Sequence, residues 1–318
     1  MPLISPSTYR TPAWLRGGHL QTIYPVLFRP MPELNSRHER LELADGDFLD
    51  LEWSGNAGKK LAIICHGLEG SARAVYVRGM AARLLNHGWD ILAWSYRGCS
   101  DEPNRLISSY HTGKTDDLDL VIRHGISQHP AERIDLIGFS LGGNLILKYI
   151  GERGTAIDRR ITRGVAFSAP CDLACCSAKL SQWQNKIYLE RFLKTLRSKV
   201  QEKHQRFPAE LDLRGLGAIH SFAGFDGQFT APLHGFSSAN DYWERSSSRQ
   251  FLGKISIPTL LVSALNDPIL GPKCYPFDEA RLNKSFFLET PPQGGHLGFY
   301  TASGYWSVTR AIEFLSAS

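Results

Sequence analysis

Ser140 lies in the stretch Gly138-Phe-Ser-Leu-Gly142, a Gly-x-Ser-x-Gly pattern at the end of an apolar run. A serine hydroxyl is a poor nucleophile until a base removes its proton, so this chemistry also needs a histidine and an acid. When such a serine follows a strand of an open α/β sheet, the acid and then the histidine come later in the chain. Asp267 and His296 occur in that order. We therefore predict that they act with Ser140.

The two glycines of the pattern fit a sharp turn from a strand into a helix. Such a turn brings backbones closer together than side chains allow, which explains Gly138 and Gly142. The turn lifts the Ser140 hydroxyl above the sheet, and the helix that follows directs its N-terminal N–H groups at the same place. The alternative is that Ser140 merely caps this helix.

The other two candidates also lie at loops that follow strands. Asp267 comes after the apolar strand residues Thr-Leu-Leu-Val, and we expect Pro268 to stop that strand. Gly294 and Gly295 precede His296 and allow its loop to fold back over the sheet edge. Two rival acids are Asp172, after the preceding strand, and Asp226.

An oxyanion formed by attack on a carbonyl needs two hydrogen-bond donors. The segment Cys-His-Gly-Leu-Glu-Gly (65–70) follows a strand and supplies a loop for one of them. We predict that the backbone N–H groups of Leu68 and Leu141 are the donors. His66 in the same loop is interpreted as a structural residue that shapes the turn by hydrogen bonding, rather than as a base.

The elements that must position these residues alternate between strands and helices. A hairpin over 40–54 with an Asp45-Gly46 turn comes first. Short apolar runs predict strands at 61–67, 90–98, 133–140, 164–170, 259–267 and 285–290. Helices are expected at about 74–87, 114–128, 142–152 and 301–316. This order is typical of a mostly parallel sheet covered by helices on both faces.

Composition excludes several classes of protein. The 318 residues are 42% hydrophobic with a formal charge of +5, and basic residues form no blocks, so nucleic acid is not indicated as a partner. The six cysteines lack the spacing of a disulfide framework or a zinc site and are expected to be reduced thiols. Because no secretion signal and no apolar run of about 18 residues is found, we expect a cytoplasmic protein without a membrane span.

We expect one domain over 1–318, with residues 171–250 inserted between two core strands as a cap. Within it, 185–207 predicts a helix with an apolar stripe of Leu189, Phe192, Leu193, Leu196 and Val200. This helix could cover an acyl pocket or make transient contact with a membrane surface. The ordinary alternative is a helix packed on its own domain with a solvated basic face.

The chain resembles a known family, the α/β-hydrolase-fold proteins, and within it the YheT-like group related to human α/β-hydrolase-domain lipases. The resemblance covers nearly the whole chain and rests on several motifs, among them PAWLRGGHLQTIYP (12–25), HGLEGS (66–71), GFSLGGN (138–144), ALNDPIL (264–270) and GGHLGF (294–299). It implies hydrolysis of carboxylic esters, such as short- to medium-chain esters or acylglycerols, by Ser140, Asp267 and His296. It implies no cofactor and no metal.

Two alternatives to ester hydrolysis remain open. His111 and Asp116 match a His-x4-Asp motif that the resemblance links to acyltransferase activity, which would use the same nucleophile. We favour a structural interpretation, with Thr115 or Asp116 capping a helix and His111 packed beneath it. A phosphate-binding loop at Gly-Lys-Thr is excluded, because Ser108 occupies the place of its first glycine. A non-catalytic binding protein is the other alternative, and proteins of that kind usually lack a member of the triad.

Overall fold

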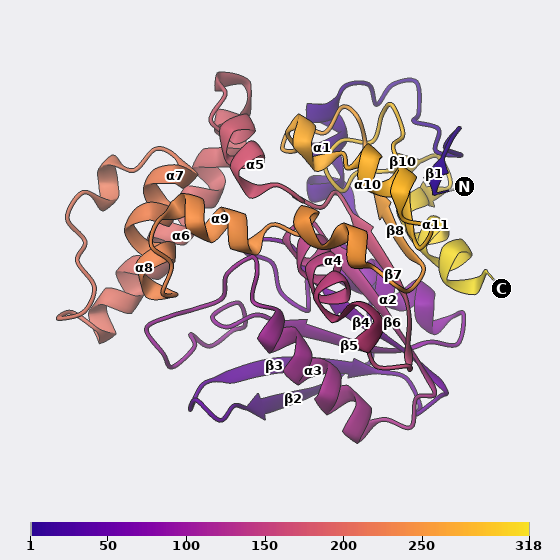
Figure 1. Cartoon of the computed structure of the whole chain (residues 1–318), viewed down its shortest axis with the longest axis horizontal. Coiled ribbons are helices and arrows are strands. Elements are labelled where there is room, and N and C mark those ends of the chain that lie inside the picture. The colour runs from indigo at the N-terminus through magenta and orange to yellow at the C-terminus, as the bar shows by residue number, and fades with distance from the viewer. Residues whose placement is uncertain (1, 318) are drawn as a thin grey trace.

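The computed structural model describes residues 2–317 and is built around one nine-stranded sheet (Figure 1). The strand order is β1-β9-β8-β7-β6-β4-β5-β3-β2, and neighbours run parallel except at the β2–β3 and β3–β5 pairs. The strands are β1 (Leu3–Ile4), β2 (Arg37–Glu42), β3 (Phe48–Ser54), β4 (Lys60–Cys65), β5 (Asp90–Ser95), β6 (Arg133–Phe139), β7 (Ile161–Phe167), β8 (Thr259–Val262) and β9 (Phe286–Glu289). The expected hairpin and all six expected core strands are confirmed.

Helices cover both faces of the sheet, which is why the central strands read as continuous apolar runs. Along β4, Leu61 and Ile63 pack into the core under α3 (Thr115–Gln128) and α4 (Leu141–Arg153). Ala62 and Ile64 pack into the opposite core under α2 (Val75–Leu85) and α11 (Trp306–Ser316). The sequence-based fold class, an α/β hydrolase with a mostly parallel sheet, is confirmed by this arrangement.

Several elements were not expected from the sequence. They are β1, α1 (Gly18–Phe28), α10 (Phe277–Leu282) and the small hairpin of β10 (Tyr300–Thr301) and β11 (Gly304–Tyr305). The hairpin takes up the first residues of the helix expected at 301–316, so α11 begins only at Trp306. The strand expected at 259–267 ends early, at Val262, and the remaining residues form the loop that holds Asp267.

The chain between β7 and β8 forms a separate group of helices beside the carboxyl ends of the strands, at the left in Figure 1. These helices are α5 (Leu173–Leu180), α6 (Lys186–Arg206), α7 (Phe222–Phe225), α8 (Ala231–Leu233) and α9 (Ala239–Ser246). A π-helical turn at Asp226–Thr230 joins α7 to α8. Residues 171–250, which the sequence predicts to be an inserted cap, lie within this segment.

Candidate active site

Ser140 occupies the turn between β6 and α4 in a strained backbone conformation, with φ 51° and ψ −117°. Strain of this kind at a non-glycine residue persists only where the surrounding structure enforces it. A Cβ atom on Gly138 would lie 2.2 Å from the Gly142 carbonyl oxygen, so these positions exclude side chains. The Ser140 side chain makes no capping hydrogen bond to α4. The helix-cap alternative is therefore wrong.

The structure brings the three predicted residues together. The Ser140 hydroxyl lies 2.9 Å from His296 Nε2, and His296 Nδ1 lies 2.8 Å from Asp267 Oδ2. The Asp267 side chain is fully buried, and it accepts backbone hydrogen bonds from Ile269 and Leu270. Because Asp267 accepts from Nδ1–H, Nε2 is left as the acceptor for the serine proton.

The helix α1 positions the His296 loop, and this contribution was missed in the sequence. The Gln21 amide oxygen accepts hydrogen bonds from the Gly294 backbone N–H and from Asn266 Nδ2, both at 2.8 Å. The Thr22 hydroxyl accepts from the His296 backbone N–H at 2.9 Å. The only signal was the motif at 12–25, which carried family resemblance but suggested no role for its polar residues.

The two backbone N–H groups predicted as oxyanion donors belong to the loop after β4 and to the first residue of α4. Leu141 supplies the first N–H of α4, which has no partner within its helix. In the loop after β4, the Gly67 and Glu69 N–H groups donate to the hydroxyls of Tyr76 and Tyr110, at 2.8 and 3.0 Å. No acceptor for the Leu68 N–H is present among residues 2–317. Leu68 and Leu141 both line the cavity that Ser140 also lines.

A cation from α6 holds the loop that carries Leu68. Lys199 Nζ lies 3.0 Å from both carboxylate oxygens of Glu69, a residue held at a φ of 56°. Tyr110 donates to the same carboxylate at 2.6 Å. Lys203 on α6 donates to the Asn104 side-chain oxygen at 2.6 Å. The expectation of a solvated basic face on this helix is therefore wrong at these two positions, because both lysines satisfy oxygens of the main domain.

His66 is a structural residue. Its Nε2 accepts the Tyr96 backbone N–H at 3.2 Å, so Nδ1 carries the proton and donates to the Gly67 carbonyl at 2.7 Å. Complete burial lowers the pKa of His66 to about 3. With both ring nitrogens occupied, His66 has no free nitrogen with which to act as a base.

His111 and Asp116 do not meet. His111 accepts the Gly113 N–H and packs against the ring of His234 in the cavity, whereas Asp116 is exposed in the first turn of α3. The expected helix cap at Thr115 or Asp116 is also wrong. The cap position is Lys114, and the Thr115 hydroxyl instead donates to Glu152 at 2.7 Å. The structure gives no support to the acyltransferase motif.

The rival acids lie elsewhere. Asp172 caps α5 by accepting the Cys175 N–H at 2.8 Å. Asp226 accepts hydrogen bonds from Trp243 Nε1 at 2.8 Å and from the Thr230 hydroxyl at 2.7 Å. Burial raises the pKa of Asp226 to about 6, although both hydrogen bonds oppose this rise.

The raised pKa of Asp226 predicts a pH-dependent stability. The folded protein holds this proton up to about pH 6, whereas the unfolded chain releases it near 3.8. The free energy of unfolding should therefore fall as the pH rises from about 4 to about 6. The contribution of this group to that fall is on the order of 3 kcal/mol. Asp226→Asn should remove that part of the fall, as measured by urea unfolding at pH 4 and pH 8. The exposed Asp278→Asn is the control, and an Asp226→Asn protein with unchanged pH dependence would contradict the prediction.

A cavity of about 370 Å³ lies between the strand ends and the cap helices, and Ser140 and His296 both line it. On the cap side the cavity is lined mainly by apolar side chains from α5, α6 and the segment 222–229, together with the charged side chains of Lys199, Lys203 and Asp226. The apolar residues of that wall include Leu180, Phe192, Leu196, Phe222, Phe225 and Phe229. The apolar stripe predicted on α6 thus faces inward, where Leu189, Leu193 and Val200 are buried, and does not form a free surface.

Neutral imidazoles line another part of the cavity. Burial lowers the pKa of His234 to about 4 and that of His111 well below its usual value. Among the described residues, no group of three or more His, Cys, Asp or Glu side chains is arranged to hold a metal ion. The six cysteines are free thiols.

Comparison with known proteins agrees with this architecture. Residues 61–303 match the family model described as the alpha/beta hydrolase fold. The Escherichia coli protein named "Putative esterase YheT" is 33% identical over 287 residues, which are 88% of this chain and 84% of that protein. Human Phospholipase ABHD3 is 26% identical over 96% of this chain and 76% of its own length.

Solved structures show the same fold at lower sequence identity. The esterase Pf2001 of Pyrococcus furiosus superposes with a TM-score of 0.58 at 18% identity, over 91% of this chain and 97% of that one. The mouse Alpha/beta hydrolase domain-containing protein 10 superposes with a TM-score of 0.57 at 12% identity, over 88% of this chain and 98% of its own. From the family match and the similarity to YheT, the chain belongs to the α/β-hydrolase family, in its YheT-like group.

Proposed function

We propose that this protein hydrolyses carboxylic esters through an acyl-enzyme formed on Ser140. The observation that carries the proposal is the hydrogen-bonded series from Ser140 through His296 to the buried Asp267, at 2.9 and 2.8 Å. This is the arrangement of a nucleophile, a general base and the group that orients the base. Relatives named as an esterase, a phospholipase and a monoacylglycerol lipase support an ester as the substrate.

Each step of the reaction has a residue to perform it. His296 Nε2 takes the hydroxyl proton as Ser140 attacks the ester carbonyl, and Asp267 stabilises the imidazolium that forms. The N–H groups of Leu68 and Leu141 bind the oxyanion. His296 then gives the proton to the leaving alcohol and afterwards activates a water molecule, which releases the acid and regenerates Ser140.

The cavity favours an apolar acyl group. Phe192, Phe222 and Phe225 line its cap side, so an acyl chain placed there would be removed from water. We propose short- to medium-chain esters or acylglycerols as the substrate class. We also propose that the chain works as one domain over 1–318 in which residues 171–250 act as a cap over the bound acyl chain.

A fluorophosphonate probe tests the nucleophile directly. The purified protein is labelled, digested and examined by peptide mass spectrometry, beside Ser140→Ala. Ser177→Ala is the matched control, because Ser177 also lines the cavity but has no histidine partner among the described residues. We expect one adduct on Ser140, its loss in Ser140→Ala and its retention in Ser177→Ala. A folded wild-type protein that takes no label, or a label that persists in Ser140→Ala, would overturn the proposal.

A further inference from the structure

The helix α1 turns an apolar face to solvent. Its 11 residues include no Asp, Glu, Lys or Arg, and its buried residues are Gln21, Thr22 and Pro25. Leu20 and Leu27 project from the opposite side and are exposed. A helix on the surface of a protein normally carries its polar residues on the outer face. Here both sides are without charge, which is the composition of a helix that is covered on both sides.

The start of α6 extends this apolar surface. His19 on α1 and Tyr188 on α6 are joined by a 3.0 Å hydrogen bond and their rings are stacked, so the two helices meet there. Six side chains with exposed fractions between 46% and 82% form what we name the docking face: Leu20, Val26, Leu27, Phe28, Trp183 and Ile187. In Figure 1, α1 and the turn between α5 and α6 both rise at the upper edge of the molecule.

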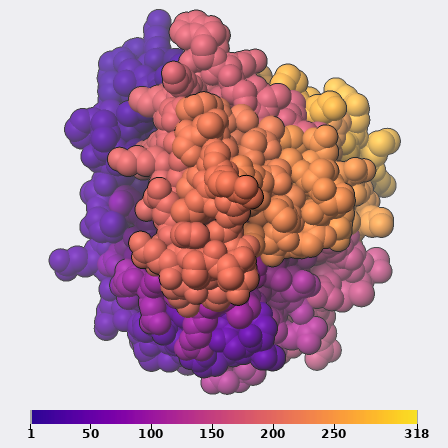
Figure 2. Space-filling view, turned by 90° about the vertical axis from the view of Figure 1, so that its left-hand side faces the viewer, coloured from indigo at the N-terminus to yellow at the C-terminus, as the bar shows by residue number. Residues whose placement is uncertain are grey.

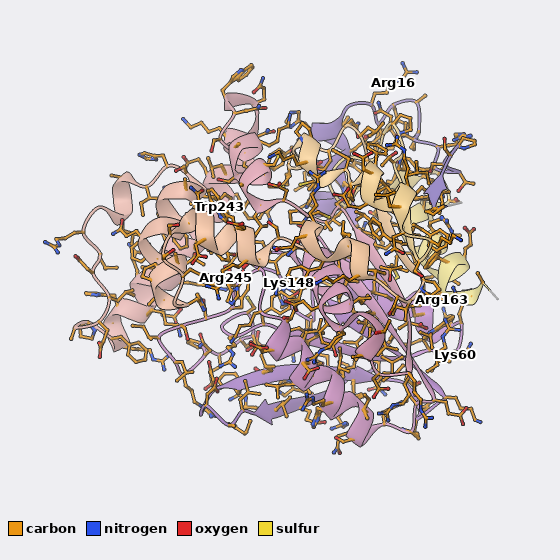
Figure 3. All side chains as sticks on the ribbon, in the orientation of Figure 1. Arg16, Lys60, Lys148, Arg163, Trp243 and Arg245 are labelled. Carbon is orange, nitrogen blue, oxygen red and sulfur yellow. The ribbon has the colours of Figure 1, made fainter. Side chains whose placement is uncertain are left out.

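The segments that carry the docking face contain cations but no acids. Residues 1–32 include three arginines, and residues 173–189 include two lysines. The nearest acids in the sequence are Glu33, Asp172 and Glu190. Arg16 and Lys186 are exposed, and neither joins the ion pairs found among residues 2–317. Figure 3 shows Arg16 extending from the upper edge of the molecule.

We propose that the docking face seats this protein on the surface of an anionic lipid bilayer. Surfaces that bind the headgroup region of such a membrane combine exposed leucine, phenylalanine and tryptophan with neighbouring cations that have no acidic partner. A protein interface, in contrast, is depleted in lysine at its core. No helix in the described part of the chain is long and apolar enough to cross a membrane.

The docking face lies on the outer side of the helix that positions His296. The inner side of α1 contacts the His296 loop through Gln21 and Thr22. Ile23 packs against Leu180 and Ile269, which also line the cavity. In Figure 2 the indigo N-terminal segment and the pink start of the cap lie side by side at the upper left. This step rests on the proposed ester hydrolysis. Docking of the protein at this face places the cavity next to membrane lipids, whose ester bonds are then within reach of Ser140.

Vesicle flotation with the full-length protein tests the docking face. Vesicles of phosphatidylcholine alone are compared with vesicles that contain an equal part of phosphatidylglycerol, at low ionic strength. We expect binding at least about tenfold stronger to the anionic vesicles, because each basic side chain near the surface adds attraction. Leu27→Glu combined with Trp183→Glu should weaken that binding by at least about tenfold, since it replaces apolar contacts by repelled charges.

The controls separate docking from folding and from catalysis. Leu120→Glu combined with Leu282→Glu makes the same kind of change on α3 and at the end of α10, where these leucines are 40% and 87% exposed, and should bind vesicles as the wild type does. Leu27→Ser combined with Trp183→Ser serves if the glutamates impair folding. Both docking-face variants should still hydrolyse a soluble ester, and Ser140→Ala should still bind vesicles, so that failure of one proposal is distinguishable from failure of the other.

Three results would overturn the proposal. The first is a wild-type protein that binds neither kind of vesicle. The second is a Leu27→Glu and Trp183→Glu protein that binds anionic vesicles as strongly as the wild type. The third is a dimer, seen by analytical ultracentrifugation, that the docking-face variants dissociate while no vesicle binding occurs; a second copy of this chain would then be the partner.

Discussion

Replacement of His296 by alanine should lower kcat/KM for a soluble ester such as p-nitrophenyl butyrate by roughly 10⁴- to 10⁶-fold while the fold stays intact. The reason is that His296 Nε2 lies 2.9 Å from the Ser140 hydroxyl, and no other side chain among residues 2–317 accepts a hydrogen bond from it. Because the members of such a unit act together, Ser140→Ala and the double variant should lose no more than His296→Ala alone. Initial rates and a circular dichroism spectrum of each variant provide the measurement.

The acid of the site can be identified by the same assay. Asp267→Asn should lower kcat/KM for the soluble ester by roughly 10³- to 10⁴-fold, because an amide at position 267 favours the wrong tautomer of His296. Asp172→Asn and Asp226→Asn keep the size of their side chains and should retain most of the activity, since these residues contact a helix end and Trp243 instead. A loss in Asp226→Asn as large as that in Asp267→Asn would contradict this assignment.

Most of the fold and the meeting of three site residues could be predicted because their signals are local. A strand that is buried between helices shows up in the sequence as four to seven consecutive apolar residues. Strands β4 and β6 have this pattern. Glycines two residues on either side of Ser140 mark a close backbone approach. The meeting of Ser140, Asp267 and His296 then follows, because the carboxyl ends of parallel strands lie at one edge of the sheet.

The remaining features could not be predicted because they depend on contacts between distant parts of the chain. Gln21 lies about 270 residues from the loop it supports, and nothing near it in the sequence points to that loop. The ion pair of Lys199 with Glu69 likewise joins the cap helix α6 to the strand edge. Thr115 is a residue type that often caps helices, but its hydroxyl donates a hydrogen bond to Glu152 on α4 instead. In these cases tertiary contacts outweigh the local preference.

Gly142→Ala should damage both the fold and the activity, because its Cβ has no space. That atom would lie 2.3 Å from the Cys65 carbonyl oxygen and 2.5 Å from that of His66, and both are backbone atoms at the end of β4. Rotation of a side chain cannot relieve such contacts, so β4 and α4 must move apart. We expect the free energy of unfolding to fall by about 2 kcal/mol or more.

The same movement should act on catalysis, because Leu68 follows the displaced strand end and Leu141 precedes the substituted residue. A shift of these two N–H groups by about 1 Å is expected to lower kcat/KM about 100-fold. Gly79→Ala in α2 is the matched control: a Cβ there meets nothing within 4 Å, so the free energy of unfolding should rise by about 0.5–1 kcal/mol with unchanged activity. Urea unfolding and ester hydrolysis of both variants measure the two effects. If Gly142→Ala behaves like Gly79→Ala, the backbone approach at Ser140 does not hold the two amides in place.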